Sequence, residues 1–137
     1  MMGHDSAHTP ILFMVEDEED TANLIKMIMG KEGYQVIHAA DGQQAQNQIA
    51  ALSPPTLILL DMGLPRVNGL ELLTQIRKRP TWIEVPVVML TADADQTDIC
   101  KAIMAGATEY ILKPFKPDVL VARLRRFRPS GPTCRVS

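Results

Sequence analysis

Short runs of consecutive apolar residues, separated by longer amphipathic segments, constrain the fold of this chain more than any other feature. Such runs lie at 11–15, 57–60, 87–90 and 111–112, and 34–39 alternates enough to form an outer strand. Continuous apolar runs are typical of strands buried on both faces of a parallel sheet. We therefore expect five strands, most of them buried, with the fourth at 85–90 and the fifth at 110–112.

The segments between these runs place apolar residues at helical spacing. The expected helices are 20–32, a second from 42 to the Ser53-Pro54-Pro55 stop, a third from 70 up to Pro80, a fourth from a polar cap within 93–98 to Gly106, and a last at about 117–127. Strands that alternate with helices need crossover connections. The sequence thus predicts a doubly wound α/β fold, with helices on both faces of a five-stranded parallel sheet.

Length and charge limit the remaining possibilities. The 137 residues suit one domain, which we place at 11–127, between a flexible N-terminal arm at 1–10 and a flexible tail at 128–137. A formal net charge of -2 gives no basis for binding nucleic acid or an anionic membrane. The two cysteines form no disulfide framework, and no apolar stretch approaches the ~20 residues of a membrane span. We expect a cytoplasmic location.

Polar residues stand where the apolar runs end. Glu16 and Asp17 follow the first run, Asp61 the third, Thr91 the fourth and Lys113 the fifth. In open parallel sheets, ligands bind beyond the carboxyl ends of the strands, so these side chains would meet at one edge. Like charges so close together are costly unless a divalent cation is bound or one group takes a proton, and a bound cation is the less costly of the two. Oxygen ligands without nearby Cys or His favour Mg²⁺, with Mn²⁺ an alternative.

A carboxylate in this setting can also act as a nucleophile toward phosphorus. Asp61 is best placed, because it ends the central strand. Mg²⁺ and the Lys113 ammonium would stabilise the charge on a transferring phosphoryl group, and the Thr91 hydroxyl could donate a further hydrogen bond. Each residue alone has an ordinary structural explanation, as a cap, a turn former or a solvated charge. Their joint occurrence at four strand ends favours the chemical one.

Four ordered motifs over about 11–127 resemble the receiver domain of two-component response regulators, the domain that also occurs alone in the bacterial chemotaxis regulator. They are Val15-Glu16-Asp17-Glu18, Leu60-Asp61-Met62-Gly63-Leu64-Pro65 with Gly69, Met89-Leu90-Thr91-Ala92, and Gly106-Ala107 through Tyr110 to Lys113-Pro114-Phe115. The resemblance implies the flavodoxin-like strand order 2-1-3-4-5 and a cis Lys113-Pro114 bond. It also implies a signalling domain rather than an enzyme in the ordinary sense.

The resemblance assigns roles to these residues. Asp61 would accept a phosphoryl group from a sensor histidine kinase or a histidine phosphotransfer protein. The Mg²⁺ ligands would be Asp17, Asp61, the backbone carbonyl of Gly63 and, mostly through water, Glu16. Lys113 would bind a phosphoryl oxygen. Thr91 and Tyr110 would form the switch pair that changes the face made by the fourth helix, fifth strand and fifth helix, and that face would signal to a downstream protein.

Two departures from the family pattern lie beside the phosphoryl position. Residue 63 is glycine, where the family usually has a larger side chain, and Asp93 adds a carboxylate two residues after Thr91. We expect Gly63 and Asp93 to set the lifetime of the phosphate. Family-style homodimerisation on phosphorylation is in doubt, because the apolar Ile99 and Val119 stand about where relatives have charged partners.

Alternative functions remain to be separated from this one. A haloacid-dehalogenase-type phosphohydrolase needs an Asp where Gly63 stands, and an FMN carrier would not want an acidic loop after Val15. A stand-alone receiver is favoured over a receiver excised from a longer DNA-binding regulator or hybrid kinase. A degenerate receiver that acts as a fixed interaction module is the third alternative.

Overall fold

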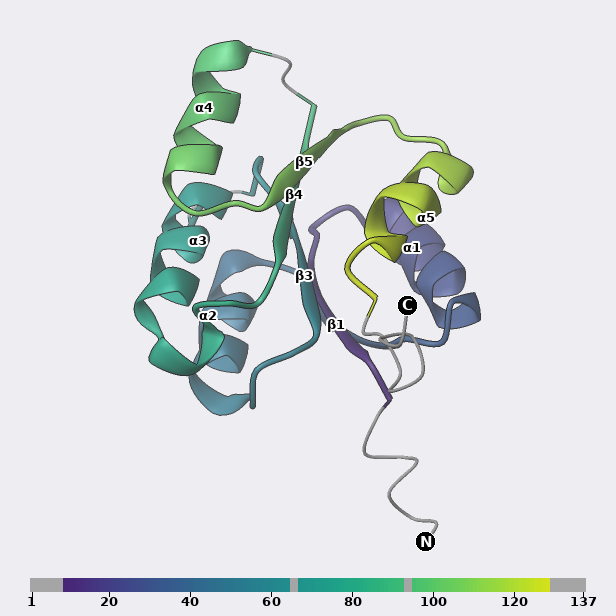
Figure 1. The fold of residues 1–137 in the computed structure, drawn as a ribbon, viewed down its shortest axis with the longest axis horizontal. Helices are drawn as coiled ribbons and strands as arrows, with labels where there is room; N and C mark the ends of the chain where they lie inside the picture. Colours follow the sequence, from purple (N-terminus) through teal and green to yellow (C-terminus); the bar gives the residue numbers. More distant parts are fainter. Residues whose placement is uncertain (1–8, 65–66, 93–94, 129–137) are drawn as a thin grey trace, which may run out of the picture.

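The computed structural model describes residues 9–64, 67–92 and 95–128 (Figure 1). Within them, five parallel strands form one sheet in the order β2-β1-β3-β4-β5. The strands are β1 (Ile11–Val15), β2 (Gln35–Ala39), β3 (Leu57–Asp61), β4 (Val87–Thr91) and β5 (Glu109–Leu112). The predicted fold class and strand order are confirmed.

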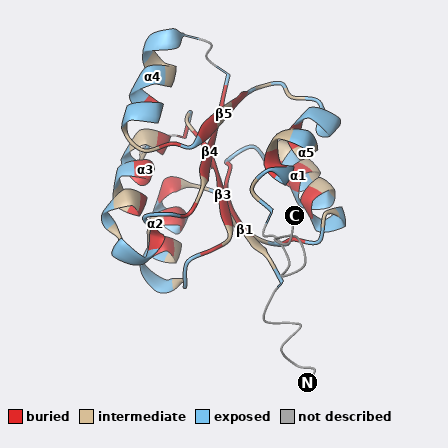
Figure 2. Ribbon diagram, in the orientation of Figure 1, coloured by how far each residue is buried: buried red, intermediate tan, exposed pale blue. Residues whose placement is uncertain are grey.

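Helices cover both faces of the sheet in the described part of the chain (Figure 1). They are α1 (Glu19–Lys31), α2 (Gly42–Ala51), α3 (Gly69–Lys78), α4 (Gln96–Met104), α5 (Pro117–Arg125) and a short 3-10 helix, η2 (Pro80–Trp82). α1 and α5 pack on one face, and α2, α3 and α4 lie on the other. Buried residues line the strands and the helix sides that face them (Figure 2). Both faces of the sheet are therefore covered, as the continuous apolar runs predict.

Local sequence explains where these helices begin and end. The Asp41 side chain accepts a hydrogen bond from the Gln44 amide at 2.8 Å and caps α2, and Asn68 forms a capping box with Glu71 at the start of α3. Gly33 and Gly106 have φ values of 94° and 113° after α1 and α4. That left-handed conformation suits glycine, so both helices stop there.

The differences from the predicted elements are small. α5 ends at Arg125 rather than at 127, although Phe127 still packs against the core. β4 begins at Val87 rather than at 85 and includes Thr91, one residue beyond the predicted end. The helix η2 was not predicted. It buries Trp82 completely, with its ring edge-on to Phe13 at a centroid distance of 6.2 Å. Burial of Trp82 against Phe13 thus accounts for a 3-10 turn that the hydrophobic pattern of the sequence does not predict.

The predicted flexible ends cannot be compared with the structure in full, since 1–8 and 129–137 lie outside the described residues. Among the helices that are described, none is long and apolar enough to cross a membrane.

On α4, Ile103 and Met104 are exposed, Met104 to 87%. The apolar residues of this helix therefore do not all face the sheet.

Candidate functional site

The register of the sheet brings the predicted site residues to one edge. Val15 pairs with Leu60, so Glu16 and Asp17 emerge beside Asp61 at the end of β3. Thr91 ends β4 and pairs with Leu112, the residue before Lys113. The five polar residues thus come from the ends of four strands, β1, β3, β4 and β5, and their convergence follows from parallel pairing.

Three carboxylates meet at this edge. One oxygen each from Glu16, Asp17 and Asp61 lie within 4.8 Å of one another. Glu16 and Asp61 are buried, whereas Asp17 is exposed to solvent. Three negative charges at this separation repel one another, so the site stores unfavourable electrostatic energy that a cation would relieve.

Lys113 is the cation that contacts two of these carboxylates. Its Nζ lies 2.9 Å from Glu16 Oε1 and 3.2 Å from Oε2, and 3.3 Å from Asp61 Oδ2. Burial alone would lower the pKa of Lys113, but its hydrogen bond to Glu16 and the charges of Asp61 and Glu16 outweigh burial, so the pKa is raised. The ammonium therefore stays charged at neutral pH.

The buried Glu16 is held on several sides. Its Oε2 accepts from the Glu18 amide at 3.1 Å, and its backbone carbonyl lies 2.8 Å from Nε2 of His38. Burial raises the pKa of Glu16, the nearby Asp61 charge adds to this, and the hydrogen bond from Lys113 partly offsets it. A further positive charge would favour the ionised form.

The donor set fits a hard divalent cation. Glu16 Oε1 is buried and makes no hydrogen bond of good geometry, although the Lys113 ammonium lies near it. Within the described residues, the cluster offers carboxylate oxygens and no Cys or His ligand. Mg²⁺ prefers such oxygen ligands, and Mn²⁺ accepts them as well. Glu16, Asp17 and Asp61 are the side chains that would hold the ion.

A cavity of about 400 Å³ opens beside the carboxylates. It is lined by Asp61, Met62, Gly63, Thr91, Ala92, Asp98 and Lys113. The Gly63 amide donates to Asp61 Oδ1 at 2.9 Å. A Cβ on Gly63 would have Asp61 Oδ1 as its nearest neighbour, at 3.7 Å, so this wall is open. The cavity can admit a group the size of a phosphate beside Asp61.

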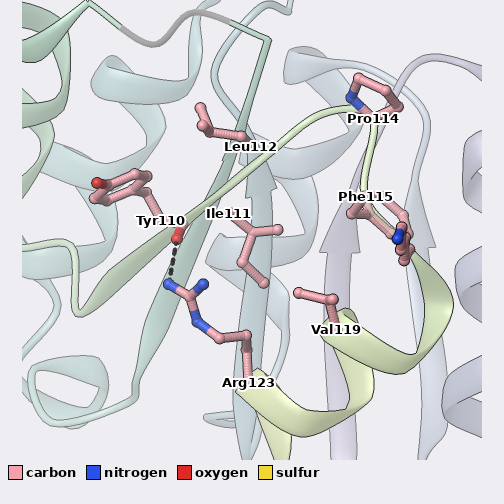
Figure 3. A pocket seen from close by; sticks show the side chains of 8 residues that line it. Tyr110, Ile111, Leu112, Pro114, Phe115, Val119 and Arg123 are labelled. Atoms are coloured by element: carbon pink, nitrogen blue, oxygen red, sulfur yellow. Dashed lines mark hydrogen bonds between the residues drawn. The ribbon is translucent and has the colours of Figure 1, made fainter.

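The remaining predicted features lie farther from the carboxylate cluster or outside the described residues. Tyr110 is half-buried on β5 and lines a different cavity, with Arg123 donating to its backbone carbonyl at 3.1 Å (Figure 3). The Lys113-Pro114 peptide is cis. Asp93 lies outside the described residues. Thr91 does not cap α4, because Asp95 does.

Sequence reasoning missed one residue of the cavity wall, Asp98. It lies in the first turn of α4 and lines the cavity, whereas the sequence of 93–98 by itself predicts only a helix cap. A signal was available in its spacing of three from the cap at Asp95, which is nearly one helical turn and carries both side chains to the same end of the helix.

Comparison with known proteins gives a consistent result. The model of the response regulator receiver domain matches residues 12–125. The DNA-binding response regulator MtrA of Mycolicibacterium paratuberculosis is 38% identical over 114 residues, which are 83% of this chain and 49% of that protein. The transcriptional regulatory protein KdpE of Mycobacterium tuberculosis is 36% identical, over 84% of this chain and 49% of that protein. The chain thus spans about half the length of these curated relatives.

Solved structures share the fold over most of their length. The receiver domain of the sensor histidine kinase PA1611 from Pseudomonas aeruginosa, described with a magnesium ion in its active site cleft, has a TM-score of 0.79 and 32% identity, over 88% of this chain and 98% of that one. The chemotaxis response regulator CheY4 of Vibrio cholerae has a TM-score of 0.81 and 25% identity, over 87% and 98%. The chain belongs to the response regulator receiver domain family of two-component systems.

Proposed function

We propose that Asp61 accepts a phosphoryl group in a reaction that needs Mg²⁺, and that a sensor histidine kinase or a histidine phosphotransfer protein supplies the group. The observation that carries the proposal is the position of Asp61. It is buried at the end of the central strand β3, with Lys113 Nζ 3.3 Å from one carboxylate oxygen and an open cavity beside it. A nucleophilic carboxylate needs such a cationic, accessible setting.

The transfer uses groups that the chain itself provides. A carboxylate oxygen of Asp61 forms a bond to phosphorus while the bond from phosphorus to the donor histidine nitrogen breaks, and that nitrogen keeps the electron pair. Lys113 binds a phosphoryl oxygen, and the Thr91 hydroxyl donates to another. Glu16, Asp17, Asp61 and the Gly63 carbonyl would hold Mg²⁺, which would supply positive charge for the phosphoryl oxygens. The product is an acyl phosphate.

A switch couples this chemistry to a distant face. A phosphoryl group adds about -1.5 to -2 charge and strong hydrogen-bond acceptors. Thr91 moves toward it, and the ring of Tyr110 turns inward to fill the vacated space. The transition needs a second arrangement of α4, β5 and α5 that differs by only a few kcal/mol. Phosphate contacts then favour that arrangement.

The output face is the surface of α4, β5 and α5, and a downstream protein binds there. A cavity of about 440 Å³ on it is lined by Tyr110, Leu112, Phe115, Val119 and Arg123, among others (Figure 3). Leu112 and Val119 are 42% and 40% exposed. Arg123 and Arg126 already pair with Glu109 of the same chain, so apolar contacts rather than ion pairs dominate this face. The same face would carry a homodimer formed on phosphorylation.

The lifetime of the phosphate depends on the open side of the cavity. Gly63 leaves room for water to approach the acyl phosphate, and the sequence adds a further carboxylate, Asp93, two residues after Thr91. We propose that these two positions set the rate of hydrolysis of the phosphorylated form, which is the slow self-dephosphorylation expected of such a domain.

We propose that the chain works as a stand-alone receiver in the cytoplasm and signals through this switch. The relatives MtrA and KdpE are DNA-binding or transcriptional regulators about twice as long as the matched segment. A receiver that forms part of a longer DNA-binding regulator is therefore the compatible alternative. The chemistry at Asp61 is the same in both.

Intact mass spectrometry after incubation with acetyl phosphate tests the proposal. One phosphoryl adduct is expected on the native protein with Mg²⁺, and none with a chelator or on the Asp61→Asn variant. An Asp118→Asn variant, changed at an exposed site on α5, should label as the native protein does. If the native protein binds Mg²⁺ but gains no adduct, the chain is a degenerate receiver that acts as a fixed interaction module.

A further inference from the structure

A side chain of the edge strand β2 holds the backbone from which two of the proposed Mg²⁺ ligands project. His38 Nε2 lies 2.8 Å from the carbonyl oxygen of Glu16. A carbonyl oxygen can only accept a hydrogen bond, so Nε2 carries a hydrogen and is the donor. The carbonyl belongs to the planar peptide group that joins Glu16 to Asp17. The hydrogen bond therefore fixes the orientation of the peptide between two neighbouring carboxylate residues.

The backbone hydrogen bonds between β1 and β2 end just before this carbonyl. The Glu16 amide donates to the Ala39 carbonyl at 3.1 Å. In a parallel pair, the Glu16 carbonyl would then accept from the amide two residues further along, which belongs to Asp41. The chain has left the sheet by then, because β2 ends at Ala39 and Asp41 is the N-terminal cap of α2. The imidazole of His38 supplies the hydrogen bond to Glu16 instead.

The alternation of side chains along β2 places His38 for this contact. His38 pairs with Met14, two residues before Glu16. It shares a face of the sheet with Val36, which packs with Met14 in the core beneath α1 and α5, and it is half-buried there. Within the described residues, the group that could hold a metal consists of the three carboxylates alone. His38 thus contacts the backbone of a ligand and is not itself a ligand.

We propose that His38 is a positioning residue for the Mg²⁺ site: its hydrogen bond to the Glu16 carbonyl holds the peptide between Glu16 and Asp17, so that both carboxylates are in place before the ion binds. This inference rests on the proposed Mg²⁺ site. The carboxylates repel one another, so a loosely held backbone would let them move apart in the metal-free protein. Bringing them together again on binding would cost affinity, and a backbone that is already held avoids that cost.

Two substitutions of similar length separate the hydrogen bond from the packing. His38→Gln keeps an N–H donor at about the position of Nε2, whereas His38→Met fills similar space without a donor. Loss of one hydrogen bond of ordinary strength should raise the Mg²⁺ dissociation constant of His38→Met by about two- to tenfold, measured by calorimetric titration of the full chain with MgCl₂. His38→Gln should bind Mg²⁺ as the native protein does. So should the control Gln35→Met, which removes an exposed amide at the opposite end of β2.

Amide hydrogen exchange in the absence of Mg²⁺, followed by NMR, tests the hydrogen bond itself. The Glu16 amide is bonded to β2, and the Glu18 amide donates to Glu16 Oε2 at 3.1 Å, so the two amides report on the backbone and the side chain of Glu16. Both should exchange faster in His38→Met than in the native protein. The Gln35 amide, which is hydrogen-bonded at the far end of β2, should exchange at the native rate.

The possible results separate this inference from the proposed function. Equal Mg²⁺ affinities of the native protein and His38→Met, or a His38→Gln that binds as weakly as His38→Met, would overturn the inference and leave the proposed function intact. Equal acceleration of exchange at Glu16, Glu18 and Gln35 would also overturn it, because that result indicates a general loss of stability. A native protein that folds but binds no Mg²⁺ would overturn the proposed function, and this inference with it.

Discussion

At the scale of single residues, the open wall at Gly63 is the main feature that distinguishes this site. The glycine amide donates to Asp61, so the backbone position is fixed, yet residue 63 itself places no side chain over the carboxylate. A Cβ there would make ordinary contact with Asp61 Oδ1 at 3.7 Å, and the residue is exposed. A larger side chain can therefore be added without disturbing the fold.

Replacement of Gly63 by Met should slow hydrolysis of the acyl phosphate several-fold, because the side chain would limit the approach of water. The decay of the phosphorylated form, followed by intact mass after removal of acetyl phosphate, measures this rate. Gly30→Met is a suitable control. Gly30 is exposed on α1, and a Cβ there would meet nothing within 4 Å. A Gly63→Met protein that labels normally and loses its phosphate at the native rate would refute the proposed role of Gly63.

At the scale of secondary structure, the two ends of α4 are held differently. The C-terminal end is tied down by Arg77 of α3, whose Nε donates to the Gly106 carbonyl at 2.9 Å. Nη1 of the same side chain lies 2.8 Å from the Val85 carbonyl, 3.1 Å from that of Ile83 and 3.2 Å from that of Trp82. Burial lowers the pKa of Arg77, which nevertheless stays charged. The N-terminal end of α4 faces the Asp61 cavity instead.

Arg77→Met should destabilise the fold by about 2 kcal/mol, because it removes charged hydrogen bonds to four backbone carbonyls around the start of β4 and the end of α4. Urea denaturation followed by circular dichroism measures the change. The neighbouring Lys78 is exposed, so Lys78→Met should change the free energy of unfolding by less than about 0.5 kcal/mol. Equal effects of the two substitutions would mean that Arg77 does not anchor this end of α4.

At the scale of the whole molecule, the fold concentrates negative charge at one edge of the sheet. The chain as a whole carries a formal charge of only -2, but three carboxylates converge within 4.8 Å. The repulsion is present only in the folded state, where parallel pairing brings the strand ends together. A cation that binds there should therefore stabilise the folded protein.

Mg²⁺ at about 100 times its dissociation constant should stabilise the native protein by about 2.7 kcal/mol and raise its Tm by roughly 5–10 °C. Differential scanning calorimetry with and without Mg²⁺ measures the shift. The Asp17→Asn variant should fold, because Asp17 is exposed, but should lose most of the shift. An unchanged shift in Asp17→Asn would contradict the assignment of this residue as a ligand.

Much of this architecture could be predicted because the signals are local and repeat. Apolar runs and helical stripes fix the alternation of elements, and parallel pairing then brings Glu16, Asp17, Asp61, Thr91 and Lys113 to one edge. Features that depend on contacts distant in sequence were missed. The burial of Trp82 against Phe13, the bonds from Arg77 to Gly106 and the place of Asp98 in the cavity wall arise from tertiary packing, which no single segment encodes.

The central claim is that Asp61 is the phosphoacceptor, and mapping the modified residue tests it most directly. The native protein would be labelled with acetyl phosphate and Mg²⁺, reduced with borohydride to convert the acyl phosphate into a stable alcohol, digested and sequenced by tandem mass spectrometry. We predict that Asp61 alone is converted. Conversion of Asp17 or another carboxylate in place of Asp61 would contradict the account.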